Sequence, residues 1–282
     1  MNNLSRQHNL SRQHNLSRQH NAVRFLPQLR ALLPPFIFLV IVLVSWQLIE
    51  VWINIPKILL PSPLEILEGA FEKRSQLASA AWITSRAALS GFALALLLGT
   101  SSALVFSVSQ LARRAIYPYM ILLQTVPIVA IAPLVIIWFG GGLNSIVAII
   151  TIISVFPITT NVTTGLTSID PGLDDLMTLY GANNWQKLWK LRLPTALPYL
   201  ISGARVSSGL TIVGAIVGEY MAGYQSQSPG LGYYVFLAST NAQSEILYAS
   251  IFISTMLGIL LFGLVTLVGK TALARWTYEM EQ

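Results

Sequence analysis

Long apolar segments separated by short polar ones make up most of this chain. Each is close to the roughly 20 residues that an α-helix needs to cross a bilayer, and we predict six membrane spans. Between the first two spans, Ser62 is expected to cap a short amphipathic helix over residues 63–74. The pattern predicts an all-α integral membrane protein with spans at about residues 36–52, 81–108, 116–139, 143–165, 197–223 and 246–268.

A polar, amphipathic segment, Thr167–Pro198, lies between the fourth and fifth predicted spans. Its apolar positions predict two short helices hinged at Gly181. Pro194 and Pro198 limit where the next helix can begin, because proline is tolerated in a first helical turn and not in an interior. We predict a compact helical knob that a partner can grip, with apolar stripes formed by Leu176, Leu179 and Tyr180 and by Trp185, Leu188 and Trp189.

Composition supports a membrane protein. Hydrophobic residues make up 54% and charged residues 10% of the chain, whereas soluble domains carry about 25% charged residues. There is no cysteine, which excludes disulfides and thiolate metal sites. The net charge of +6 could suggest nucleic acid, but the basic residues are scattered between spans. We therefore expect a lipid bilayer and no nucleic acid as partner.

The N-terminus repeats the hexapeptide NLSRQH three times, over residues 3–20. Such polar repeats cannot bury enough surface to fold, so residues 1–31 are predicted as a disordered tail and residues 32–282 as the transmembrane domain. All three histidines lie in the repeats. A metal-binding tract is the alternative to a neutral sequence expansion, which we favour, and we predict no metal site.

Basic residues predict the orientation in the membrane. Arginines and no acid precede the first span, which places the N-terminus in the cytoplasm, and six spans return the C-terminus to the same side. The predicted outer segments contain Lys57, Lys73 and Arg74, whereas the predicted inner ones contain Arg113, Arg114, Lys187, Lys190, Arg192, Lys270 and Arg275. Segment 167–198 is therefore expected to face the cytoplasm.

One motif resembles a known family. Gly181, nine residues and then Leu191-Arg192-Leu193-Pro194 resemble the coupling loop of binding-protein-dependent ABC importer permeases, whose pattern is E-A-A, three residues, G, nine residues, I, any, L-P. Asp175-Leu176-Met177 stands where E-A-A would. The similarity is greatest to the nitrate, sulfonate, taurine, pyrimidine-precursor and riboflavin branch. Other matching residues are Ala132-Pro133-Leu134, Trp138-Phe139-Gly140, Phe156-Pro157-Ile158, Gly203-Ala204-Arg205, Glu219 and Gly230-Leu231-Gly232.

The resemblance implies a type I importer permease fold in a bacterial inner membrane. It also implies a non-catalytic subunit that works with cytoplasmic ATPases, an external solute-binding protein and a second permease copy, expected as a homodimer. ATP and Mg would then bind the ATPases, and no cofactor this chain. The implied roles are a hinge at Gly181, a cap or salt-bridge partner at Asp175, a rigid link at Leu193-Pro194, and docking anchors at Trp185, Leu188 and Trp189.

Prolines in the third and fourth predicted spans mark a candidate solute path. Each removes a helical hydrogen bond, and broken backbone within a membrane is tolerated where it is buried in protein or faces a water-filled cavity. Ordinary helix-packing prolines are the alternative. The path candidates are Pro127, Pro133 and Pro157, with Gln124, Phe156 and Thr160 as polar or aromatic neighbours.

Charged residues within spans are costly and therefore informative. Arg205 and Glu219 are further path candidates, with a structural anchor as the alternative for Glu219. Fourteen residues of helix place them on a similar face but about 21 Å apart, so they cannot pair with each other.

The sequence leaves the solute open among pyrimidine or thiamine precursors, riboflavin, sulfonates, taurine and nitrate. The third and fourth predicted spans contain no fixed positive charge, which favours a neutral or aromatic solute. An ion-coupled secondary transporter is the alternative function, disfavoured because the spans offer one acid and no histidine. Gly269-Lys270-Thr271 is not a phosphate loop, because Leu264 occupies the position of the first glycine of that motif.

Overall fold

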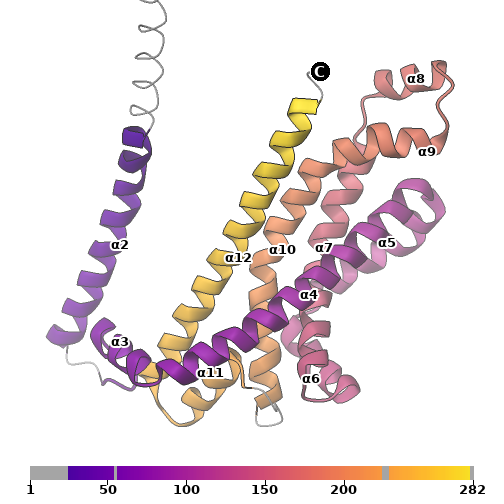
Figure 1. Ribbon diagram of the computed structural model, residues 1–282. Coiled ribbons are helices and arrows are strands. Elements are labelled where there is room, and N and C mark those ends of the chain that lie inside the picture. Colours follow the sequence, from indigo (N-terminus) through magenta and orange to yellow (C-terminus); the bar gives the residue numbers. More distant parts are fainter. Residues whose placement is uncertain (1–24, 54–55, 224–228, 280–282) are drawn as a thin grey trace, which may run out of the picture. The chain divides into compact units, whose positions relative to one another are not determined.

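A computed structural model describes residues 25–53, 56–223 and 229–279 (Figure 1). All regular secondary structure in these ranges is helical, as predicted. The chain divides after Glu65 into an N-terminal unit and a larger unit of residues 66–282, each described here by itself.

The N-terminal unit contains the first predicted span, within helix α2 (Phe25–Ile53). This helix begins inside the segment 1–31 that we predicted as a disordered tail, and the NLSRQH repeats lie outside the described residues. Ser62 caps helix α3 (Pro63–Glu72) as predicted: its Oγ accepts from the Glu65 amide at 3.2 Å, and Glu65 Oε2 accepts from the Ser62 amide at 3.0 Å. Lys57 forms an ion pair with Glu65, and this contact, with the Ser62 amide, lowers the pKa of Glu65.

The larger unit continues from α3 with α4 (Arg74–Val108), α5 (Gln110–Thr125), α6 (Ile128–Phe139) and α7 (Leu143–Thr167). Helices α8 (Pro171–Leu179) and α9 (Asn184–Lys187) follow, and a π-helical turn (Leu188–Arg192) leads into α10 (Leu193–Ala222). The chain ends with α11 (Leu231–Thr240) and α12 (Ser244–Glu279). In Figure 1, α8 and α9 lie at one end of this unit, which we call the knob end, and α11 lies at the opposite, far end.

Helices long and apolar enough to cross a membrane lie at four of the predicted spans of this unit: α4, α7, the α9–α10 rod and α12. The third predicted span is different, because α5 and α6 meet at a bend of 104°. Pro127 disfavours the helical conformation at the residue before it, and Val126 is extended (φ −76°, ψ 124°). The third predicted span, residues 116–139, therefore consists of two helices and not one.

The core of the larger unit forms where α7 packs against α4 and α10. Glycines allow the close approach: a Cβ on Gly91 would lie 2.5 Å from the Ile150 side chain, and one on Gly203 would lie 3.0 Å from the Pro157 carbonyl. Small residues at helix contacts are typical of membrane bundles. Buried hydroxyls add a connection between α7 and α10, since Ser207 donates to the Ser154 carbonyl at 2.7 Å.

Candidate functional site

A tight turn at Gly181 joins α8 to α9. Gly181 has φ +73°, in the left-handed region that favours glycine. Its amide donates to the Thr178 carbonyl at 2.9 Å, and the Ala182 amide donates to the Met177 carbonyl at 2.9 Å. These two bonds form a Schellman motif, which ends α8 and reverses the chain. The predicted hinge position is therefore a defined turn.

Polar side chains hold the two short helices together. Asp170 Oδ1 caps α8 by accepting from the Gly172 amide at 2.8 Å, and Asn183 and Gln186 form a capping box on α9. Lys187 is buried, and its Nζ donates to Asp174 Oδ2 at 3.0 Å and to Thr178 Oγ1 at 2.7 Å. We call this unit, residues 170–192, the knob.

Among the described residues, Asp175 supplies neither the helix cap nor the ion pair of the knob. Its side chain is exposed on α8, whereas the cap comes from Asp170 and the ion pair from Asp174. Neighbouring helical residues point about 100° apart, so only one of the two adjacent acids can face α9. Asp174 and Lys187 are thus site residues that sequence reasoning missed.

The knob exposes an apolar surface. Trp185 and Trp189 are 66% and 57% exposed, with their rings edge to face at a centroid distance of 6.0 Å. We call this the knob surface, and it consists of Leu176, Leu179, Tyr180, Trp185 and Trp189. Leu188, predicted as a third docking anchor beside the tryptophans, is instead buried in the bundle core with Ala103, Val162 and Ala196. Leu188 therefore packs the knob against the core, whereas the two tryptophans remain exposed.

The knob continues into the fifth span without a break. The Leu193 amide donates to the Leu188 carbonyl five residues back, which makes the π turn, and α10 begins at Leu193. Pro194 has no amide hydrogen, so the ordinary helical bond to the Lys190 carbonyl cannot form. Residues Asn184–Ala222 form one continuous helical rod of 39 residues, which turns between α9 and α10 (Figure 1). The expected start of this span near residue 197 lies within the rod.

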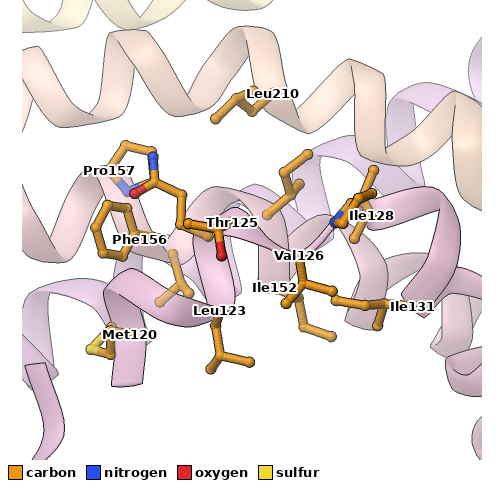
Figure 2. Close-up of a pocket in the computed structure, with 14 residues that line it drawn as sticks. Met120, Leu123, Thr125, Val126, Ile128, Ile131, Ile152, Phe156, Pro157 and Leu210 are labelled. Atoms are coloured by element: carbon orange, nitrogen blue, oxygen red, sulfur yellow. The ribbon is translucent and has the colours of Figure 1, made fainter. Parts of the chain in front are cut away.

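A cavity of about 410 Å³ lies at the bend between α5 and α6 and extends to α7 and α10 (Figure 2). It brings together four path candidates from two segments: Gln124 and Pro127 at the bend, and Phe156 and Pro157 in α7. The other lining residues are Met120, Leu123, Thr125, Val126, Ile128, Ile131, Ile152, Ile153, Val155 and Leu210.

The cavity is apolar with few polar groups. None of its lining residues is charged, and Gln124 and Thr125 have its only polar side chains. Thr125 donates its hydroxyl hydrogen to the Leu122 carbonyl at 2.8 Å, so its free lone pairs can only accept. Pro157 has no amide hydrogen and cannot donate to the Ile153 carbonyl one turn earlier. Gln124 can both donate and accept.

The remaining path candidates lie outside this cavity. Pro133 is exposed on α6, and Thr160 donates to the Phe156 carbonyl at 3.0 Å. Arg205 is half-buried on α10, and Glu219 is fully buried near the end of that helix. Glu219 contacts Thr84, which sequence reasoning did not select, because a threonine in an apolar span gives no signal of its own.

Comparisons with known proteins identify the family. The family described as "binding-protein-dependent transport system inner membrane component" matches residues 92–277. A formylaminopyrimidine transport permease protein of Halalkalibacterium halodurans is 33% identical, over 82% of this chain and 91% of the relative. A riboflavin transport system permease protein of Chloroflexus aurantiacus is 31% identical, over 84% and 88% of the two chains.

The fold matches a solved transporter. An inward-facing structure of the methionine ABC transporter MetNI superposes with a TM-score of 0.61 at 17% identity, covering 71% of this chain and 97% of the other. The sequence resemblance is therefore confirmed by family, relatives and fold together. The chain belongs to the inner membrane components of binding-protein-dependent transport systems, the permease subunits of ABC importers.

Proposed function

We propose that this permease works with a cytoplasmic ATPase bound at the knob surface and moves an uncharged heterocyclic solute through the cavity at the α5–α6 bend. ATP and Mg bind the ATPase subunits, and an external binding protein delivers the solute. A second copy of the chain completes the transporter. Both termini and the knob lie on the cytoplasmic side, in agreement with the basic residues around the knob.

The observation that carries this proposal is the exposed pair Trp185 and Trp189 on a rigid knob. Large exposed apolar patches mark interaction sites, and tryptophans are enriched among residues that dominate binding energy. The caps, the Schellman turn and the Lys187–Asp174 ion pair fix the knob in one shape. An amphipathic helix of this kind fits into an apolar groove of a partner.

The same rod that presents the tryptophans also reaches the cavity. Trp185 and Leu210 both belong to the continuous helix Asn184–Ala222, and Leu210 lines the cavity. A displacement of the knob by the ATPase therefore moves one cavity wall directly. ATP binding would move the helices as rigid bodies so that the cavity opens outward, and hydrolysis would reset them.

The cavity chemistry favours an uncharged, flat solute with hydrogen-bonding edges. Phe156 offers an aromatic face for stacking, while the side chains of Gln124 and Thr125 offer polar partners. A sulfonate or nitrate would have to leave water without a cation among the lining residues, which is costly. Formylaminopyrimidine and riboflavin, named for two relatives, are heterocycles. Pyrimidine or thiamine precursors and riboflavin are thus preferred over sulfonate, taurine and nitrate.

Purification of the tagged chain from its own host tests the proposal. A stable complex with an ATPase is expected. Solute uptake by that complex in proteoliposomes should require ATP on the side of the membrane that carries the knob and the ATPase. Uptake by the chain alone, driven by a proton or sodium gradient, would support the ion-coupled alternative and contradict the proposal.

A further inference from the structure

The far end of α10 carries a buried acid that joins three helices. Glu219 is 0% exposed. Its Oε2 accepts from the Gly232 amide of α11 at 2.8 Å, and both carboxylate oxygens lie 2.9 Å from Thr84 Oγ1 of α4. Thr84 Oγ1 in turn accepts from the Leu231 amide at 2.9 Å. One carboxylate and one hydroxyl thus satisfy the first two amides of α11, which would otherwise lack partners.

Two glycines make room for this contact. A Cβ on Gly230 would overlap the Glu219 carboxylate, and a Cβ on Gly232 would lie 2.5 Å from the Ile216 carbonyl. The start of α11 therefore sits directly on the last turns of α10. The sequence motif Gly230-Leu231-Gly232 and the distant Glu219 belong to one contact.

The position of the contact suggests its role. Glu219 is 34 residues after Trp185 on one continuous helical rod, at the far end from the knob surface (Figure 1). Along the chain, α10 ends at Ala222 and α11 begins at Leu231. The carboxylate contact joins α10 directly to the beginning of α11 and, through Thr84, to α4.

We propose that Glu219 is a positioning residue that makes the far ends of α4, α10 and α11 move as one body during transport. The role rests on the proposed function, because it assumes that the ATPase drives the knob end of the rod. A buried carboxyl group is suited to it, because its two oxygens reach the Gly232 amide of α11 and the Thr84 hydroxyl of α4 at the same time. Movement at the knob then reaches the outer face through these bonds.

Thr84→Val tests the contact, because it removes the hydroxyl that donates to Glu219 and accepts from the Leu231 amide. Valine and threonine have nearly the same size, so the packing around residue 84 is retained. Thr84→Ser keeps the hydroxyl and is the matched control, and Glu219→Gln is a second test of similar shape. In the reconstituted complex, Thr84→Val and Glu219→Gln should lower solute uptake per ATP hydrolysed by about tenfold. ATPase association and hydrolysis should stay close to wild type, since the knob is remote. Thr84→Ser should behave like wild type.

A distance measurement separates coordinated motion from mere stability. The chain has no cysteine, so Ser79→Cys on α4 and Ser239→Cys on α11, both exposed, give one pair of spin-label sites. In the unmutated background, the distribution of distances between the two spin labels should be the same with and without ATP. In the Thr84→Val background this distribution should broaden. A nucleotide-dependent change in the unmutated background, or normal uptake per ATP in both Thr84→Val and Glu219→Gln, would overturn the proposal. Failure of the unmodified chain to bind an ATPase would instead contradict the proposed function.

Discussion

Lys187 donates to Asp174 at 3.0 Å across the Gly181 turn, and this ion pair fixes how α9 lies against α8. The ammonium group is buried, whereas Asp174 is about one-third exposed. Thr178 supplies a second acceptor from the same helix. The orientation of the knob surface thus depends on the contacts of Lys187 with Asp174 and Thr178.

Asp174→Asn should weaken ATPase binding, because it removes the negative partner of a buried ammonium group. We expect a cost of about 1 kcal/mol, below that of a fully buried pair because water reaches Asp174. Asp175→Asn is the matched control, being one residue away, exposed and outside the ion pair. Co-purification with the ATPase measures the difference. Equal losses in the two variants would show that the net charge of α8 matters and the ion pair does not.

Trp189→Ala and Leu188→Ala should fail in different ways although the residues are adjacent. Trp189 is exposed, so its loss should reduce ATPase association by about 2 kcal/mol while thermal stability is retained. Leu188 is in the core, so its loss should lower the free energy of unfolding by about 2–4 kcal/mol. Thermal unfolding in detergent and ATPase pull-down measure both effects. The assignment of the two faces would be wrong if Leu188→Ala left stability unchanged and abolished binding.

Gly181→Ala should destabilise the turn by about 1 kcal/mol, because φ of +73° is unfavourable for a residue with a Cβ. Gly181→Asn should cost less, since asparagine tolerates this region, and Gly181→Val should cost more. No atom lies within 4 Å of the added Cβ, so crowding cannot explain a loss. Amide hydrogen exchange of Met177–Ala182 measures the turn. Equal exchange in all three variants would argue against a backbone requirement.

Phe156→Ala should lower solute uptake about fivefold, which corresponds to loss of about 1 kcal/mol of stacking. ATP hydrolysis should persist, because the knob surface is unchanged. Thr160→Ala, one turn further along α7, is the control, since Thr160 does not line the cavity. Uptake of a radiolabelled aminopyrimidine into proteoliposomes is the readout. Similar uptake by Phe156→Ala and wild type would remove the cavity from the solute path.

The membrane fold could be predicted from the sequence because length and apolarity decide which segments can span a bilayer. The bend at Val126 and Pro127 could not be predicted in full. A proline predicts a missing hydrogen bond, but an angle of 104° also depends on how α6 packs against α7. The proline therefore predicts the position of the bend, whereas its angle depends on the packing of α6.

The knob shows where helical periodicity stops being sufficient. The spacing of Trp185, Leu188 and Trp189 predicts a shared stripe, but the π turn begins at Leu188 and the bundle covers only that residue. The contact between Thr84 and Glu219 joins residues 135 apart in sequence, beyond any local pattern. These features require the packed structure because they depend on which elements meet.

Site-specific photocrosslinking from position 189 tests the central claim most directly. A benzophenone amino acid replaces Trp189 on the knob surface, and Ser239, exposed on α11 at the far end, is the control position. In native membranes the probe at 189 should crosslink to a nucleotide-hydrolysing subunit from the cytoplasmic side, and the probe at 239 should not. Crosslinks from position 189 to an external protein, or to no ATPase at all, would contradict the account.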